Sequence, residues 1–344
     1  MKTVILGLSG GVDSLVTALL LKQQNYRVIA CTFKLWENES SIENARALAQ
    51  KLDIEFKVLD IANSFKQNII DPFIADYISG ETPNPCVWCN NEIKVYYLYQ
   101  EMINSNADFF ATGHYINIKK TKEQYYIHRG IDEPKDQSYF LWNVRSKYLK
   151  YWLTPLGNLE KTEVKQIAID HKIGFLAHKK ESMGVCFIGE AGYHQFLNEN
   201  KSSNQEIISG SIVDKNNKVL GEHNGIPYYT IGQKKGLELS EEGLSVIEID
   251  RKNNKLVVGT KQDLYTHSFS VNDYYFINIE DTFCQNIYVW VRGLGRNPEG
   301  FCKIEIINDK LLNIDLEGQA WALAKGQPVA FYIEDKLIGG GYIN

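Results

Sequence analysis

The N-terminal segment constrains the fold of this chain more than any other. An apolar run, Thr3–Leu8, leads into Ser9-Gly10-Gly11-Val12-Asp13-Ser14, and a helical pattern follows over Leu15–Gln24. Glycines between a strand and a helix let the backbone approach a ligand, and the helix start offers free N–H groups to an anion. The loop matches neither GxxxxGK nor GxGxxG. It predicts another kind of phosphate-binding loop, with a plain glycine turn as the alternative.

Strand and helix patterns alternate through the first third of the chain. This alternation is typical of a parallel sheet with helices on both faces. Further strands are expected at Arg27–Phe33, Glu55–Ile61 and Asp108–Thr112, and helices at Ile42–Leu52, Phe65–Ile78, Lys94–Ile103 and, within a mostly helical stretch over 145–197, Thr162–His171.

The composition changes near residue 200. The polar stretch Asn198–Gln205 is expected to be a linker, and short alternating segments with turn signals follow it. Strands are expected at Ser211–Val213, Ser245–Ile249, Lys255–Val258, Ile287–Val291 and Pro328–Ile333. We therefore expect an α/β domain over residues 1–200, a small central β domain over 206–268 and a C-terminal β-barrel over 269–344.

Composition excludes several classes of protein. The chain is 44% hydrophobic and 23% charged, as expected of a globular protein. No apolar run approaches the roughly 18 residues of a membrane span, and Met1 leads almost directly into a strand without a signal peptide. Six cysteines are too few for a disulfide scaffold. We expect a cytoplasmic protein, without a membrane partner, whose cysteines are candidates for chemistry or metal binding.

The charge is unevenly distributed along the chain. The net charge is −5, yet residues 111–190 carry 13 Lys and Arg against 9 Asp and Glu. Residues 1–110 carry 9 against 13. A basic middle segment suits a phosphate-rich partner, and an ordinary scatter of solvated lysines explains it equally well.

Three cysteines stand in distinctive surroundings. Cys86 and Cys89 follow two prolines in an extended, stiff segment, and Cys186 lies in a separate stretch. We expect a helix to begin near Cys89 and to lower the pKa of its thiol. Two separated thiols suit persulfide chemistry, in which one carries the extra sulfur and the other resolves the bond with formation of a disulfide. As the alternative, Cys86, Cys89 and Cys186 are three ligands of a 4Fe–4S cluster.

Several longer motifs occur in one order along the chain. They are GLSGGVDS, TPNPCVWCNNEIK, ATGHY, KDQSYFLW, MGVCFIGE, GEHNGIPYYTIGQKKGL and GQPVAFY. Over essentially its whole length the chain resembles the tRNA-specific 2-thiouridylases (the MnmA/TrmU family), whose first loop belongs to the ATP-pyrophosphatase superfamily.

The resemblance implies an activity and its partners. ATP, with Mg²⁺ held by Asp13, adenylates O2 of the wobble uridine of tRNA. A persulfide on Cys186, supplied by a sulfur-donor protein, then attacks C2, Cys89 resolves the intermediate, and AMP and pyrophosphate are released. The helical end of the first domain is expected to help bind tRNA.

The resemblance also assigns residues. ATP is expected at Gly7, Leu8, Ser9, Gly10, Gly11, Val12, Asp13, Ser14, Phe33 and Gly113; the target base at Asn84, Pro85 and Cys86; and tRNA at His114, Lys135, Asp136, Gln137, Arg292 and Gln327. Three positions depart from the family pattern: Cys86 replaces a common Asp, Phe33 a common Met, and Gly293 an aromatic residue.

Two other functions remain open from the sequence. One is an ATP-pyrophosphatase thiolase that acts at another tRNA position. The other is an RNA- or nucleotide-binding module without chemistry. The modified nucleoside separates the first from the expected activity, and tRNA-dependent AMP release excludes the second.

Overall fold

The N-terminal domain is built on a parallel sheet. The computed structural model describes residues 1–35, 39–171, 173–174, 184–189, 192–203, 205–292, 295 and 297–344. The sheet has the order β3-β2-β1-β4-β7, and all its neighbours are parallel. Its strands are β1 (Thr3–Gly7), β2 (Arg27–Lys34), β3 (Glu55–Asp60), β4 (Phe109–Ala111) and β7 (Trp152–Leu153). The strand order reverses between β1 and β4, which is the point where open α/β sheets bind their ligands.

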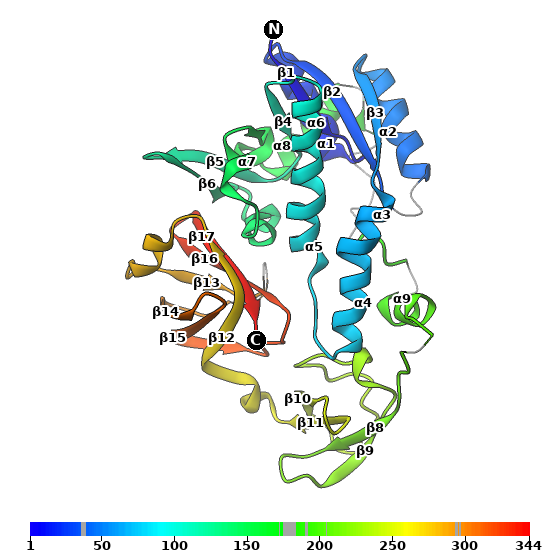
Figure 1. The fold of residues 1–344 in the computed structure, drawn as a ribbon, viewed down its shortest axis with the longest axis vertical. Helices are drawn as coiled ribbons and strands as arrows, with labels where there is room; N and C mark the ends of the chain where they lie inside the picture. The colour runs from blue at the N-terminus through cyan, green and yellow to red at the C-terminus, as the bar shows by residue number, and fades with distance from the viewer. Residues whose placement is uncertain are drawn as a thin grey trace.

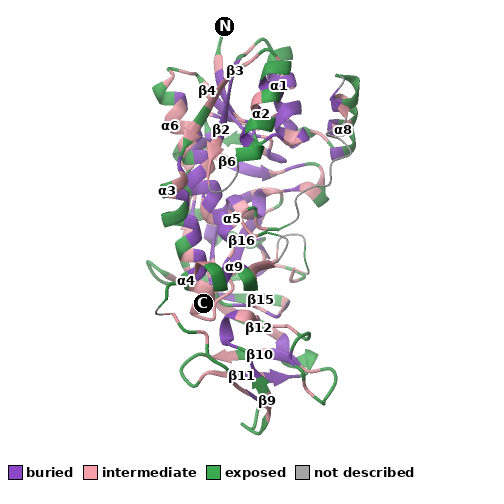
Figure 2. Ribbon diagram, turned by 90° about the vertical axis from the view of Figure 1, so that its right-hand side faces the viewer, coloured by how far each residue is buried: buried purple, intermediate pink, exposed green. Residues whose placement is uncertain are grey.

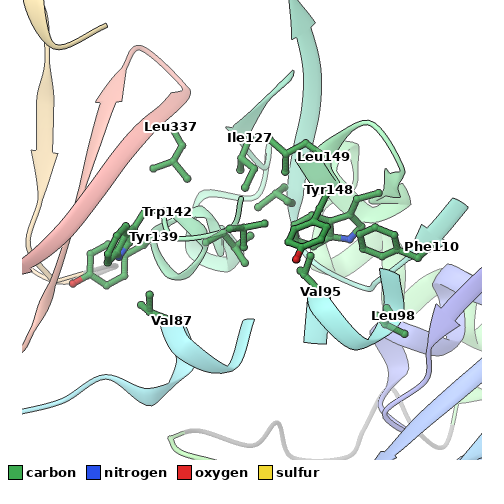
Figure 3. Packing of buried hydrophobic residues seen from close by; sticks show 14 of the residues in the cluster. Val87, Val95, Leu98, Phe110, Ile127, Tyr139, Trp142, Tyr148, Leu149 and Leu337 are labelled. Carbon is green, nitrogen blue, oxygen red and sulfur yellow. The ribbon is translucent and has the colours of Figure 1, made fainter. Parts of the chain in front are cut away.

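Helices cover both faces of this sheet, as the sequence predicts. On one face, α1 (Val12–Gln23), α2 (Glu39–Lys51) and α8 (Lys161–Asp170) share a core. On the other, α6 (Tyr96–Asn104) packs Leu98 against the strands. Figure 3 shows Leu98 and Phe110 in this second core.

Two composite helices cross the middle of the molecule (Figure 1). The first joins α3 (Ala62–Phe65), η1 (Lys66–Ile70) and α4 (Asp71–Ile78), and the second joins α5 (Pro85–Trp88), η2 (Cys89–Val95) and α6. Both η1 and η2 are π-helical, and they contact each other. Such π-helical stretches often occur at functional sites.

The segment expected to be mostly helical over 145–197 is more mixed. Its described elements are α7 (Ser146–Leu149), β7, the 3₁₀ turn η5 (Pro155–Asn158), α8 and α9 (Gly192–Asn200). The start of the expected linker at Asn198 is the last turn of α9. Two further 3₁₀ turns, η3 (Glu133–Lys135) and η4 (Ser138–Leu141), precede this segment.

A hairpin that the sequence analysis did not anticipate connects the first domain to the last. Strands β5 (Ile116–Thr121) and β6 (Gln124–Arg129) form the hairpin, and β6 pairs with β17 (Lys336–Ile343). The C-terminal sheet therefore continues into the N-terminal domain (Figure 1).

The middle and C-terminal regions are β-rich, as predicted. The middle sheet has the order β10-β11-β8-β9. It is formed by β8 (Gly210–Val213), β9 (Val219–His223), β10 (Ser245–Asp250) and β11 (Lys255–Gly259), with the 3₁₀ turns η7 (Ile226–Tyr228) and η8 (Lys261–Leu264). Only the β11–β8 pair among these described strands is parallel.

The C-terminal strands form a barrel around their own core. Their order is β13-β16-β17-β12-β15-β14, and a bridge between Ile287 and Cys302 joins the two ends. The elements are β12 (Tyr265–Phe276), η9 (Ile279–Phe283), β13 (Tyr288–Trp290), β14 (Cys302–Asn308), β15 (Leu311–Trp321), β16 (Pro328–Ile333) and β17. Position 269, expected to open this domain, lies inside β12.

Each of the three regions contains buried residues of its own (Figure 2). Separate apolar cores lie on the two faces of the parallel sheet, in the middle sheet and inside the barrel. No helix in the described part of the chain is long and apolar enough to cross a membrane.

Candidate functional site

The glycine loop has the geometry of an anion site. It follows β1, Gly11 caps α1, and Gly10 has a φ of +79°, a value that glycine adopts without strain. The Ser14 hydroxyl donates to the Gly11 carbonyl at 3.0 Å and accepts from the Ser9 N–H at 3.2 Å. The side chains thus fix the loop while the start of α1 stays available to phosphate.

Gly113 lies against this loop, immediately after β4. A Cβ atom at Gly113 would lie 3.0 Å from the Asp13 carbonyl carbon and 3.0 Å from the Ser14 nitrogen. Only glycine fits there without displacing the loop backbone. The structure therefore brings together two of the segments expected to bind ATP, at the point where the strand order reverses.

Asp13 is held by two groups from distant parts of the chain. Lys161 donates to both carboxylate oxygens, at 2.6 and 2.8 Å, and the Tyr115 hydroxyl donates to Oδ1 at 2.7 Å. The Lys161 side chain is only 9% exposed. The ammonium group therefore lies beside the phosphate loop, where it neutralises the Asp13 carboxylate.

The sequence analysis missed Lys161, although a signal for it exists. Lys161 is the first residue of α8, next to the capping box formed by Glu160 and Glu163. A cation in the first turn opposes the helix dipole, so a buried lysine there calls for a specific anionic partner. Asp13 is that partner in this structure.

The Cys86–Cys89 segment corrects one expectation. The helix begins at Pro85, where the Asn84 side chain accepts from the Cys86 N–H, and Cys89 lies within the continuous helix at the start of η2. No free helix start faces Cys89. Burial instead raises the pKa of its thiol to about 12, and burial also raises the pKa of Cys86. The prediction of a lowered Cys89 pKa is wrong.

Cys186 lies next to an aromatic anchor. Cys186 itself is exposed, whereas the neighbouring Phe187 ring packs edge-on against Phe65 and Phe73, with centroids 5.8 and 5.2 Å apart. Phe187 packs on the same apolar cluster that contains Cys89. The Cys186 loop is therefore packed on α3 and α4, in the same apolar cluster as Cys89. Met183 and Glu190, quoted in the same motif, lie outside the described residues.

One cation serves all three thiols. Burial raises the pKa of all three thiols, Cys86, Cys89 and Cys186, and Lys94 is the second influence on each, which partly offsets this rise. Lys94 lies five residues after Cys89 in the π-helical stretch. A π-helix joins residues five apart by its hydrogen bonds, so this local geometry turns Lys94 toward the face that carries Cys89.

The apolar cluster that contains Cys89 lies at the same end of the parallel sheet as the phosphate loop, namely at the carboxyl ends of the strands. Phe33, Leu35 and Leu59, from the carboxyl ends of β2 and β3, pack against the cluster with Cys89. The phosphate loop follows β1, and Gly113 follows β4, at that same edge of the parallel sheet. Phe33 packs on both this cluster and the core beneath α6.

The cysteines are not assembled as a metal site. In the part of the chain that the structure describes, no three His, Cys, Asp or Glu side chains are grouped to hold a metal ion. The ligand set Cys86–Cys89–Cys186 thus does not fit a cluster as it stands. All six cysteines are free, so the disulfide expected during sulfur transfer is not formed in this state.

Of the residues expected to bind tRNA, two are buried. The His114 Nδ1 atom and the Thr112 hydroxyl form a hydrogen bond of 2.7 Å. Burial together with Lys94 lowers the pKa of His114 to about 3. The Asp136 carboxylate accepts from the Gly130 N–H at 3.0 Å and from the Ser138 hydroxyl at 2.7 Å. The structure gives these two side chains internal partners.

The remaining tRNA candidates are less buried. Lys135 and Gln137 are half-buried, and the Gln137 amide oxygen accepts from the Tyr115 N–H at 3.0 Å. The Arg292 guanidinium donates to the Ala322 carbonyl and stacks 4.8 Å from the Trp321 ring centroid. Gln327 donates to the Thr82 carbonyl, close to the cysteine segment. Gly293 lies outside the described residues.

Comparisons with known proteins identify the family. Three family models match in order: "tRNA methyl transferase HUP domain" over residues 2–190, "tRNA methyl transferase PRC-barrel domain" over 194–260, and "Aminomethyltransferase beta-barrel domain" over 266–343. The tRNA-specific 2-thiouridylase MnmA of Clostridium beijerinckii is 38% identical, over 99% of this chain and 98% of its own length. The chain belongs to the MnmA family of tRNA-specific 2-thiouridylases.

Other relatives agree. The tRNA-specific 2-thiouridylase MnmA of Clostridium botulinum strain Eklund 17B is 37% identical over 99% of this chain and 98% of its own length. Among solved structures, a 4-thiouridine synthetase–RNA complex with bound ATP matches 54% of this chain and 45% of that chain, at 17% identity and a TM-score of 0.38. That likeness is too distant to carry an argument.

Proposed function

We propose that this MnmA-family protein uses ATP to replace O2 of the wobble uridine of tRNA with sulfur. As a member of the family it is a tRNA sulfurtransferase. The observation that carries the proposal is the meeting of two half-sites at one sheet edge. The phosphate loop follows β1, and the cluster around Cys89 packs on the ends of β2 and β3.

The first half-reaction takes place at the phosphate loop. Residues Gly7–Ser14, with Phe33 and Gly113, bind ATP complexed with Mg²⁺. The uridine O2 attacks the α-phosphorus, the bond to the β-phosphate oxygen breaks, and pyrophosphate leaves. Lys161 and the N–H groups at the start of α1 stabilise the charge that develops on the phosphates. Asp13 would hold the Mg²⁺ that accompanies the nucleotide, and the ion would offset negative charge on the phosphates.

The second half-reaction takes place at the thiols. Cys186 receives a sulfur atom from a persulfide-carrying donor protein, and its terminal sulfur bonds to C2 of the adenylated uridine. Cys89 then attacks the Cys186 sulfur, so the S–S bond of the persulfide breaks and a Cys89–Cys186 disulfide forms. AMP leaves with the former O2, and a dithiol reductant restores the thiols.

Electrostatics support this division of roles. Cys186 is exposed and reachable by a donor protein, whereas Cys89 is buried and protected from solvent oxidants. A buried thiol with a raised pKa needs a nearby cation to become a nucleophile, and Lys94 lowers the pKa of Cys89. Lys94 is therefore expected to support the attack by Cys89.

The tRNA is expected to reach both half-sites. Asn84, Pro85 and Cys86 are expected to contact the target base, and their position at the start of the helix that carries Cys89 supports this expectation. Lys135, Gln137, Arg292 and Gln327 are expected to contact tRNA. His114 and Asp136 are expected to act through the groups that they hold, the Thr112 hydroxyl and the Gly130 N–H, since both side chains are buried.

The 4Fe–4S alternative assigns Cys86, Cys89 and Cys186 a different task. We favour the two-thiol route, because the described thiols are not grouped as metal ligands. Anaerobic purification tests this choice. A colourless protein with an active Cys86→Ser variant is expected, and a brown protein that loses iron and activity together in that variant would overturn it.

The experiment for the function is nucleoside analysis of tRNA. The protein, with ATP, Mg²⁺ and a persulfide donor, should produce 2-thiouridine at the wobble position in a cytoplasmic tRNA pool. Sulfur at another uridine would favour the alternative thiolase. AMP release that does not depend on tRNA, with no thionucleoside, would exclude both.

A further inference from the structure

The residue Thr82, which precedes the cysteine segment, is bonded to both β domains. Its N–H donates to the Lys325 carbonyl at 2.8 Å, and its carbonyl accepts from the Gln327 amide. Its hydroxyl lies 2.6 Å from the hydroxyl of Thr230, in the middle region. Thr82 therefore uses every polar group it has to join three parts of the molecule.

Its neighbour Glu81 joins the same parts by charge. The Glu81 carboxylate lies 3.7 Å from the Lys325 ammonium and 3.9 Å from the Arg251 guanidinium. Gly326 has a φ of +85°, and a Cβ atom there would lie 3.3 Å from the Glu81 Cβ and 3.5 Å from the Thr82 nitrogen. The backbone of the barrel thus approaches the segment closely.

A shift in the position of Thr82 is expected to move the cysteines as well, because the segment between them is stiff. Pro83 and Pro85 are both buried and have a fixed φ, and Asn84 between them caps the helix that follows. The chain from Thr82 to Cys86 is therefore short and stiff.

The barrel also supports the helix that carries the thiols. Val87, between the two cysteines, is fully buried in the core that includes Trp142 and Leu337 (Figure 3). The Trp88 ring lies 6.4 Å from that of Tyr342, in β17. On the opposite side, Cys89 packs in the cluster to which Phe187 is anchored. The cysteine turn thus lies between the barrel and the Cys186 loop.

We propose that Thr82 is a positioning residue, through which the middle region and the barrel hold Cys86 and Cys89 in register with Cys186. The proposal rests on the function given above and deepens it: the two β regions take part in sulfur transfer as well as in binding tRNA. Gln327, expected to contact tRNA, then links RNA binding to the position of the thiols.

The test removes the Thr82–Thr230 hydroxyl pair without changing side-chain shape. The variants are Thr230→Val, which loses the hydroxyl, and Thr230→Ser, which keeps it, with Thr266→Val in strand β12 as a matched control. The first measurement is the rate of Cys89–Cys186 disulfide formation under a mild oxidant, without RNA or ATP. The second is single-turnover thiolation at saturating tRNA, alongside the rate of pyrophosphate release.

Thr230→Val is expected to slow both disulfide formation and sulfur transfer about fivefold, the effect of roughly one hydrogen bond. Pyrophosphate release and tRNA affinity should stay at the wild-type level, and Thr230→Ser should restore the sulfur step. An unchanged disulfide rate in Thr230→Val would overturn the proposal. So would an equal slowing of pyrophosphate release, which would indicate general loss of structure.

The positioning role of Thr82 and the proposed thiolation activity can be contradicted by separate results. Disulfide formation reports only the placement of the thiols and needs no substrate, so it can contradict the positioning role while thiolation remains intact. Loss of the proposed function would appear instead as wild-type protein that makes no thionucleoside, whatever its disulfide rate.

Discussion

The phosphate loop and the cysteine site are built in opposite ways. The loop is polar, its serines bond to one another and to its backbone, and its carboxylate already has a cationic partner at 2.6 Å. The cysteine site is apolar, and burial raises the pKa of both Cys86 and Cys89. Its described neighbourhood supplies the thiols with a favourable charge from Lys94.

This difference reflects what each half-reaction needs. Phosphate transfer gains from fixed dipoles and cations that are in place before the substrate binds. In the proposed mechanism a persulfide must survive until the adenylate forms, so low reactivity of the resting thiols is an advantage. The charged groups of the nucleotide site are therefore in place before substrate binds, whereas the thiols are expected to stay protonated and unreactive until RNA binds.

The largest effect is expected from the exposed thiol. Cys186→Ser should reduce 2-thiouridine formation by more than about 10³-fold, because no other group carries the sulfur. Pyrophosphate release should persist, since the loop is intact. Mass spectrometry of the nucleosides, run beside a pyrophosphate assay, measures both. Wild-type thiolation by this variant would remove Cys186 from the reaction.

A smaller effect is expected from the cation beside the phosphate loop. Lys161→Met should slow pyrophosphate release by about 10²-fold, the usual effect of losing one group that stabilises transition-state charge. Lys165→Met, which removes a charge from the same helix, is the matched control. A similar loss in both variants would show that the charge of α8, and not the Asp13 partner, is responsible.

Lys94 should affect the reactivity of the thiols. Lys94→Met removes the cation that lowers the pKa of Cys89, and the rate of Cys89 alkylation at pH 8 should fall up to about tenfold, or one pKa unit. Lys94→Arg should retain most of the rate, and Lys303→Met, on an exposed strand, should leave it unchanged. Equal alkylation in all variants would refute the role of Lys94.

The pH dependence of the same reaction gives a sign to check. Because burial raises the Cys89 pKa from 9.0 to about 12, alkylation in a Cys186→Ser background should rise about tenfold per pH unit up to pH 10, without a plateau. The neutral buried thiol stabilises the fold below pH 9, and that stability is lost as the pH rises toward 12. A plateau near pH 9 would place the thiol in water.

His114 predicts the opposite dependence at acid pH. Its pKa is lowered from 6.5 to about 3, so between these pH values the imidazole is protonated in the unfolded chain and neutral in the folded chain. The free energy of unfolding should therefore fall by roughly 1.4 kcal/mol per pH unit below about pH 6.5, down to about pH 3. Urea unfolding at pH 7 and pH 5 measures the change, which His114→Gln should reduce.

The smallest effect concerns tRNA affinity. Lys135→Glu should weaken binding and reduce the slope of log K against log salt by about one, if the half-buried Lys135 contacts a phosphate. A binding series from low to high salt measures the slope. An affinity that matches wild type throughout the series would leave the basic segment over 111–190 without a role at this residue.

The geometry of the glycine loop was easier to predict from the sequence than the surroundings of Cys89, for a physical reason. A loop between a strand and a helix is local, so Gly10 and Gly11 reveal its geometry directly. The expected α/β domain and the C-terminal barrel are confirmed by the sheets and by the family models. The pKa of Cys89, in contrast, depends on burial by α3, α4 and Phe187, which no local pattern reveals.

Non-local contacts explain the other differences. The β5–β6 hairpin pairs with β17, more than 200 residues away, because Leu337 of the barrel meets Ile127. Lys161 reaches Asp13 across 148 positions. Sequence spacing alone brings none of these groups together.

The proposed mechanism requires that adenylation at the phosphate loop comes first and does not need the thiols. It is tested most directly with a variant that carries both Cys89→Ser and Cys186→Ser, mixed with tRNA and ATP labelled at the α-phosphate. The account predicts that label appears on the tRNA as an adenylate and that pyrophosphate is released, with no 2-thiouridine formed. Label that never reaches the tRNA, although ATP binds, would contradict it.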